Sequence, residues 1–100
     1  MAYRINYSKV ISQANSIADD ASELAAQIKV LEQLEQECQS VWKGQAADAF
    51  IAKLRTLRSE MNRTKSQISN LASTIKYCAD RIQQEDRRAE ERAAALKSGR

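Results

Sequence analysis

The side chains that most often carry out catalysis are scarce in this sequence. Its 100 residues include no histidine, and the two cysteines are Cys38 and Cys78. Without histidine there is no Ser-His-Asp or Cys-His pair to activate a nucleophile, and no imidazole ligand for a metal ion. The only glycines, Gly44 and Gly99, form no glycine-rich phosphate loop. We therefore expect no catalytic residues, no metal or cofactor site and no small-molecule substrate.

The residues best suited to recognition lie together near the middle of the chain. Trp42 is the only tryptophan, Gly44 follows it by two residues, and Phe50 comes one to two helical turns later. Two aromatic rings in contact contribute about 1 kcal/mol beyond the burial of their area. We expect the Trp42 ring to close one end of a helical hairpin against Phe50, with Gly44 in the turn.

Two long heptad patterns flank this segment and must position it. Apolar residues recur at alternating steps of three and four, which line one face of an α-helix. The spacing predicts a helix over about residues 8–42, a turn at about 43–45 and a second helix over about 46–95, all in a single domain of residues 1–100. Ser8 is the expected N-cap, with Asn6 as the alternative.

Each predicted helix carries two heptad series. In the first helix only Glu35 interrupts them, and Leu34 beside it is a candidate to fill the gap. The series in the first helix are Val10, Ile17, Leu24, Leu31 and Cys38, and Ala14, Ala21, Ile28, Glu35 and Trp42. Those in the second helix are Ala47, Leu54, Met61, Ile68, Ile75, Ile82 and Ala89, and Phe50, Leu57, Thr64, Leu71 and Cys78.

The two patterns mirror each other about Gly44. Facing residues of an antiparallel hairpin have numbers with a constant sum, and half of that sum falls at the glycine here. Glycine reaches positive φ without a steric penalty, as a tight turn requires. The sequence therefore predicts an all-α, antiparallel two-helix hairpin. In it Cys38 and Cys78 lie roughly 40 Å apart, too far for a disulfide within the chain, and we expect both to be buried thiols.

The first helix also carries apolar residues beside its predicted facing stripe. A lone two-helix hairpin covers each stripe on one side only and has little surplus stability. Exposed apolar stripes usually mark association, so we expect this surface to face a partner in a four-helix bundle. The alternative is a set of edge residues covered by neighbouring side chains. The residues are Ile11, Ala18, Ala25, Val30, Leu34 and Val41.

Charge is concentrated in the C-terminal tail, over about residues 83–100. Its opposite charges alternate at helical spacing, which predicts a solvated helix that projects past the first and is either inert or a handle for another protein. The whole chain has 16 basic and 13 acidic residues, a net charge of +3, and no continuous basic stripe, so nucleic acid is not an expected partner. We expect neither a membrane span nor a cleaved signal peptide.

The length, the helical pattern and the central Trp42-x-Gly44 followed by Phe50 together resemble the WXG family of ESAT-6-like proteins. The resemblance covers essentially the whole chain. It implies a hairpin that dimerises into a four-helix bundle, with an identical or a different WXG-like chain. It also implies export by the type VII secretion system of Gram-positive bacteria and mycobacteria, through that system's membrane ATPase. Such a protein is cytoplasmic before export and secreted or on the cell surface afterwards.

In much of the family the export signal is Tyr-x-x-x-Asp/Glu in the tail of the second helix. Here Tyr77 is the only tyrosine in that region, Arg81 stands four residues later, and the nearest acid is Asp80. We interpret Tyr77 and Asp80 as a degenerate signal. One alternative is an adaptor that binds the helical N-terminal domain of an LXG toxin and is exported with it. Another is a cytosolic coiled-coil adaptor unrelated to secretion.

Overall fold

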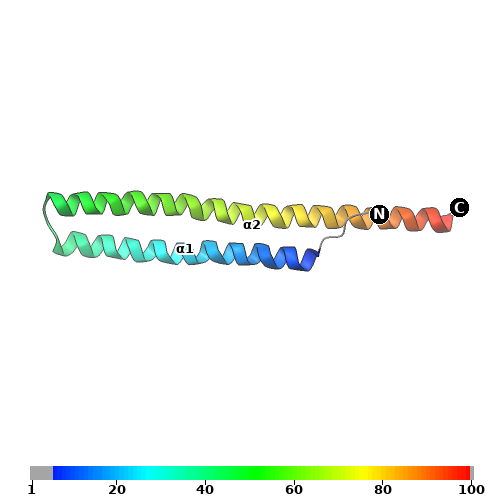
Figure 1. The fold of residues 1–100 in the computed structure, drawn as a ribbon, viewed down its shortest axis with the longest axis horizontal. Coiled ribbons are helices and arrows are strands. Elements are labelled where there is room, and N and C mark those ends of the chain that lie inside the picture. Colours follow the sequence, from blue (N-terminus) through cyan, green and yellow to red (C-terminus); the bar gives the residue numbers. More distant parts are fainter. Residues whose placement is uncertain (1–5, 100) are drawn as a thin grey trace.

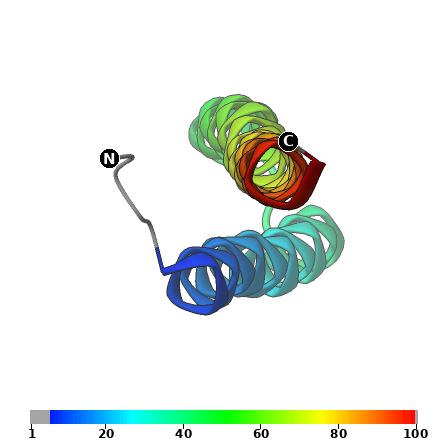
Figure 2. The ribbon, with the colours of Figure 1, turned by 90° about the vertical axis from the view of Figure 1, so that its right-hand side faces the viewer.

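In the computed structural model, which describes residues 6–99, the chain forms two helices, α1 (Tyr7–Val41) and α2 (Gln45–Gly99). They lie antiparallel and side by side, and α2 continues past the start of α1 (Figure 1). The rod measures 84 × 16 × 16 Å, and a view along it shows two coils with no third layer (Figure 2). The predicted all-α helical hairpin is therefore confirmed.

The N-terminus of α1 is set by a side-chain cap. The Asn6 side-chain oxygen accepts a hydrogen bond from the backbone N–H of Lys9 at 3.0 Å, so Asn6 is the N-cap and Ser8 lies inside the first turn. The prediction of Ser8 as the N-cap was wrong by two residues, and the alternative, Asn6, is the cap. Beginning the helix at Tyr7 places its hydroxyl where it donates to Asp86 of α2, which ties the open end of the hairpin together.

The turn between the helices depends on one backbone conformation. Trp42 leaves the helix in an extended conformation, although its N–H still donates to the carbonyl of Cys38 at 2.9 Å. Gly44 then adopts a φ of +111°, which confirms the positive φ predicted for the turn. Its carbonyl accepts from the N–H of Asp48, so α2 starts immediately after it.

The contact between the helices is a narrow strip of mostly small residues. Alanine side chains let two helix backbones approach closely, and the alanines of α1 lie at the same levels of the rod as alanines of α2. The buried apolar residues are Ala14, Ala21 and Ile28 in α1, and Ala47, Ile51, Leu54, Ala72 and Ala79 in α2.

The strip on α2 differs from the prediction in one of its two series. The series that begins at Ala47 faces α1 as far as Ile75, whereas Ile82 is exposed. The second series was predicted wrongly, because the structure turns α2 so that the next residue in each heptad faces α1. Small residues at 72 and 79 fit against the alanines of α1, where Leu71 and Cys78 would hold the helices apart. The facing series is Ile51, Arg58, Lys65, Ala72 and Ala79, and the exposed one is Phe50, Leu57, Thr64, Leu71 and Cys78.

The rotation of α2 also determines how exposed Cys78 is. The thiols of Cys38 and Cys78 are both free, and the structure forms no disulfide between them, as predicted. Cys38 is half-buried and Cys78 is exposed, so the expectation that both are buried was wrong. Ala79 takes the buried position that the prediction gave to Cys78.

Replacing Gly44 tests the turn. A Cβ at this position would meet nothing within 4 Å, so any cost comes from the backbone conformation alone. We expect Gly44→Val to lower the free energy of unfolding by about 1–2 kcal/mol, and Gly44→Ala by less, because valine is β-branched. Each kcal/mol lowers Tm by about 4–8 °C in a chain of this size. Thermal melts followed by circular dichroism at equal protein concentrations measure this change in Tm. A Gly44→Val variant that melts like wild type would contradict the assigned turn.

Candidate functional site

The tip of the hairpin presents an aromatic pair. The ring centroids of Trp42 and Phe50 lie 5.6 Å apart, at an interplanar angle of 51°, which is a favourable tilted contact. The predicted meeting of these two residues is present in the structure. Neither ring is buried, since Trp42 is 43% and Phe50 is 41% exposed. The pair therefore covers the end of the rod and also offers aromatic surface to a partner.

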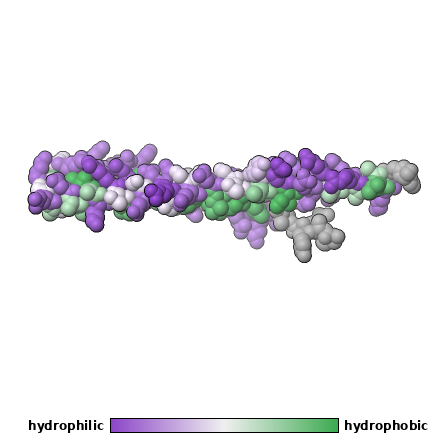
Figure 3. All heavy atoms as spheres, turned by 90° about the horizontal axis from the view of Figure 1, so that it is seen from above, coloured by the Kyte–Doolittle hydropathy of each residue, from purple (hydrophilic) through white to green (hydrophobic). Residues whose placement is uncertain are grey.

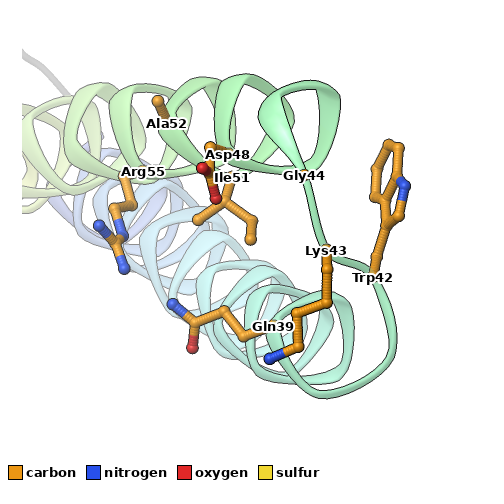
Figure 4. Close-up of a pocket in the computed structure, with 8 residues that line it drawn as sticks. All are labelled: Gln39, Trp42, Lys43, Gly44, Asp48, Ile51, Ala52 and Arg55. Carbon is orange, nitrogen blue, oxygen red and sulfur yellow. The ribbon is translucent and has the colours of Figure 1, made fainter.

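An open groove of about 620 Å³ lies beside this pair (Figure 4). The Trp42 ring stands beyond the turn at one end of it and Arg55 lies at the other end, with the side chains of Gln39 and Lys43 between them. Ile51 forms part of its apolar floor, and Asp48 adds an acidic group. A groove this open, with opposite charges at its edge, is a place for a protein side chain rather than an enclosed ligand site.

Behind the tip, one carboxylate holds two arginines across the helix pair. Glu35 of α1 is buried, and its two oxygens accept hydrogen bonds from Arg55 Nε at 2.9 Å and Arg58 Nη1 at 2.8 Å. Glu35 was predicted to interrupt the apolar series and Leu34 to fill the gap, and both predictions were wrong. Leu34 is exposed, and Glu35 keeps its place in the strip because the arginines satisfy it.

These contacts lower the pKa of the Glu35 carboxyl below its ordinary value. The hydrogen bond from Arg55 is the largest cause, partial burial works in the opposite direction, and the positive charges of Arg58 and Arg55 lower the pKa further. A signal for this cluster was present in the sequence. The mirror relation about Gly44 places Glu35 at the level of Leu54, next to Arg55.

Two heptad series of mostly apolar residues lie on the same flank of the rod. On α2, each residue of the exposed series that begins at Phe50 lies three positions after a residue of the series that begins at Ala47. On α1, each residue of the half-buried series that includes Ile17 lies three positions after a residue of the series that includes Ala14. In an antiparallel pair these two flanks lie on the same side. Figure 3 shows hydrophobic side chains gathered on one edge of the rod from about its middle towards the tail, with a separate smaller patch near the hairpin tip. We call this surface the lateral stripe: Val10, Ile17, Leu24, Leu31 and Cys38 of α1, and Phe50, Leu57, Thr64, Leu71 and Cys78 of α2.

The residues predicted to face a partner are distributed over more than one flank. Leu34 and Val41 are exposed beside the α1 half of the lateral stripe, whereas Val30 is exposed on the outer face of α1. Three others, Ile11, Ala18 and Ala25, are half-buried on the flank opposite the stripe. The larger apolar residues of α2, Leu57 at 46% and Leu71 at 52% exposed, were missed because the prediction placed them between the helices.

The predicted export-signal residues lie on the exposed part of α2. Tyr77 is 62% exposed. Arg81 donates a hydrogen bond to its hydroxyl at 3.1 Å and places its guanidinium carbon 5.8 Å from the ring centroid. Asp80 accepts a hydrogen bond from Gln84 at 3.0 Å and so points along a different line of the helix. The structure does not bring Tyr77 and Asp80 into contact.

Neither the tip nor the lateral stripe carries a catalytic constellation. Within residues 6–99, no group of three His, Cys, Asp or Glu side chains is placed to hold a metal ion. Over the same stretch, neither helix combines the length and the apolar character that crossing a bilayer requires. What this geometry offers is an aromatic tip, an apolar flank and a charged helical tail, all of which suit binding to other proteins.

A helical hairpin with Trp-x-Gly in its turn defines a class of small all-helical proteins. The family model WXG100, described as proteins of 100 residues with WXG, matches residues 2–87. The chain therefore belongs to the WXG100 family. Comparison with curated proteins found no match, and comparison with solved structures found none either.

Family membership establishes the general setting of this protein. WXG100 proteins are small helical proteins of type VII secretion and export, and they are not known as enzymes. They commonly pair with other WXG-like chains. The aromatic tip is the place where this chain carries the family's motif.

The Glu35 cluster predicts a pH-dependent stability. Because folding lowers the pKa of Glu35, the cluster stabilises the hairpin above the unfolded pKa of about 4.3, and this contribution is lost as pH falls through the folded pKa. We expect Glu35→Gln to melt below wild type at about pH 7 and the difference to shrink towards about pH 3.

Glu32→Gln is the matched control, since it removes an exposed carboxylate from the same helix. Its Tm should stay close to wild type across the range. A constant difference between Glu35→Gln and wild type at every pH would show that the charge of Glu35 does not carry the effect.

The aromatic pair is tested by a double-mutant cycle. Trp42→Ala is expected to cost about 1–2 kcal/mol of unfolding free energy, less than the 3–5 kcal/mol of a fully buried tryptophan, because the ring is 43% exposed. Trp42→Ala, Phe50→Ala and the double variant should give a coupling of about 1 kcal/mol. Additive losses would mean that the two rings do not stabilise each other in solution.

Proposed function

We propose that this chain is a substrate or co-secreted partner of the type VII secretion system that acts by binding proteins, not by catalysis. The observation that carries this is the exposed lateral stripe, in a chain whose family is dedicated to type VII secretion. The tip contributes a second exposed recognition element in Trp42 and Phe50.

The surface area supports association with a partner. The chain exposes 7869 Å², whereas a compact monomer of 11.3 kDa exposes about 5,700 Å². The excess arises because each helix of a two-helix rod is covered on one side only. A second hairpin on the lateral stripe would cover apolar residues of both helices at once and complete a four-helix bundle.

The chain's own partner is therefore another WXG-like hairpin, with the same or a different sequence. The lateral stripe is the main surface proposed for it, and Leu34 and Val41 lie beside that stripe and extend it toward the tip. Val30, Ile11, Ala18 and Ala25 belong to other lines of α1, where they would contact a partner only at the edge of the bundle.

We propose that the C-terminal half of α2, before the charged tail, contains the signal read by the membrane ATPase. Tyr77 is the residue best placed for this, because it is exposed on the part of the rod beyond most of the buried strip. Asp80 is its nearest acidic neighbour in the sequence and is likewise exposed.

A second candidate function is that of an adaptor for an LXG toxin. The observation that favours it is Arg81, which occupies the fourth position after Tyr77 and engages both the hydroxyl and the ring of that tyrosine. A basic residue stands where the family signal has an acid, so the export signal of the complex would then belong to the toxin or to another partner.

Export in the native host separates these roles. Tyr77→Ala should abolish appearance of the protein in the culture medium while the cellular level stays at least as high, because the exposed ring contributes little to the fold. The matched control is Tyr77→Phe, which keeps the ring, together with Leu96→Ala, which removes another exposed apolar side chain of α2.

Unchanged export of Tyr77→Ala would overturn Tyr77 as the signal. In that case, capture with the tagged chain should recover an LXG toxin whose own export requires this protein, as the adaptor role demands. Loss of export for all three variants would instead indicate a general effect on the helix.

A further inference from the structure

The face of α2 that packs on α1 continues past the end of α1. The first residue of α1 is Tyr7, whose hydroxyl donates to Asp86, whereas α2 runs on to Gly99 (Figure 1). Around and beyond Asp86, the heptad positions that face α1 in the paired part of the rod keep apolar residues. We call these residues the tail line: Ile82, Ala89, Ala93 and Leu96.

Within residues 6–99, nothing covers the tail line. All four of its residues are exposed, and Leu96 is 81% exposed. A stretch of helix without a packing partner is only marginally stable in water, and an exposed apolar surface usually marks a contact. The tail line therefore needs an occupant, and α1 is too short to supply it.

The first five residues of the chain, which lie outside the described range, have the pattern of such an occupant. The apolar residues Met1, Tyr3 and Ile5 are separated by one residue each. In an extended segment, alternate side chains point to the same side. One side of this segment is therefore apolar, and the other carries Arg4.

We propose that residues 1–5 lie extended along the tail line and act as a strap on the tail of α2. The chain is already extended at Asn6, where φ is −84° and ψ is 94°. Tyr77 lies two residues from the buried Ala79, and so on the opposite side of α2, where the strap leaves it uncovered. The inference goes beyond the proposed function and does not depend on it.

The length of the segment matches the length of the tail line. The mirror relation about Gly44 puts Tyr7 at the level of Ile82. An extended chain advances about 3.3 Å per residue and a helix 1.5 Å, so each residue of the segment passes about two residues of α2. Counted back from Tyr7, Tyr3 reaches the level of about residue 91 and Met1 that of about residue 95.

The side chains at these levels are complementary in size. Tyr3 falls between Ala89 and Ala93, which leave room for its ring, and Met1 falls beside Leu96. The segment is also tethered at the end of the tail line, which gives it a high effective concentration there. These two properties favour residues 1–5 of the same chain over a separate partner.

Such a strap gives the tail a covered and an uncovered form. With the strap in place, the tail presents its charged flanks, and Leu96 is hidden. Displacing the five residues exposes the tail line to another protein. A binding partner that uses the tail as a handle therefore competes with the chain's own first residues.

A pair of introduced cysteines tests the contact in the full-length chain. In a background with Cys38→Ala and Cys78→Ala, Tyr3→Cys with Ala93→Cys should close an intrachain disulfide under mild oxidation. We expect it to form at least about tenfold faster than the disulfide of Tyr3→Cys with Ala95→Cys. Ala95 is the matched control, since it is an exposed alanine of the same tail on the opposite side of the helix.

Hydrogen exchange, followed by mass spectrometry, tests the effect of the strap on the tail. Tyr3→Ser combined with Ile5→Ser should speed exchange of the amides between Ala89 and Leu96 at least about fivefold. The amides of α2 that lie opposite α1 should keep their wild-type rates, which shows that the hairpin itself is intact. The matched control is Ala2→Ser, on the other side of the segment, and its tail should exchange like wild type.

Three results would overturn the strap. Equal disulfide rates for Ala93→Cys and Ala95→Cys mean that the segment does not lie on the tail line. Unchanged tail exchange in the double serine variant means that the segment does not hold the tail. Fast linking that gives a covalent two-chain product means that the occupant is a second copy. No result depends on Tyr77, the lateral stripe or export, so failure here is distinguishable from failure of the proposed function.

Discussion

The structure depends on one geometric constraint: two helices that lie side by side bury only one narrow strip of each. In this chain the strip is lined largely by alanines, of which Ala14 and Ala47 are fully buried. Close approach of the backbones then excludes the larger side chains from the contact. Leu57, Leu71 and Phe50 instead lie exposed on the flank of α2. The interaction surface is a direct consequence of how the hairpin itself packs.

Polar contacts fix the alignment that this apolar strip leaves open. Small residues repeated every seven positions allow two helices to slide by one heptad with little change in burial. The Glu35 contacts with Arg55 and Arg58 near the tip, and the Tyr7–Asp86 contact at the open end, are each made in one register only. A hairpin shifted by one heptad would lose these contacts, so they favour the observed register over its neighbours. Together with the turn at Gly44, these contacts define a single hairpin.

Much of this architecture could be predicted from the sequence. The mirrored heptads and the glycine between them predicted an antiparallel hairpin that turns at Gly44, and the structure has that hairpin with the expected positive φ. The meeting of Trp42 and Phe50 was also predicted, because Phe50 lies only one turn into the second helix, close to the turn that Trp42 enters. These features depend on the spacing of apolar residues and on the backbone freedom of glycine, and both can be read from the sequence of one chain.

The rotation of α2 could not be predicted in the same way. Phe50 and Ile51 begin two adjacent heptad series, and hydrophobicity favoured the series with Leu57 and Leu71 because the other contains Arg58 and Lys65. In the structure, two contacts favour the other series, which begins at Ile51. The alanines of α1 require small neighbours, which only Ala72 and Ala79 supply, and Glu35 accepts from Arg58, which removes the cost of a charge near the strip. The alanine packing and the Glu35–Arg58 contact each depend on two helices together, so the periodicity of one helix cannot predict them.

This rotation of α2 determines which side chains the rod exposes to other proteins. If the Phe50 series lay between the helices, the hairpin would be better packed alone, and its flank would consist of Arg58 and Lys65 with small alanines. Such a rod would have little reason to associate. With the series turned outward, the same residues form an exposed and mostly apolar flank, and such surfaces usually mark sites of association. The isolated rod is therefore less well packed than it could be, and its apolar flank stays exposed, which fits a family whose members commonly pair with one another.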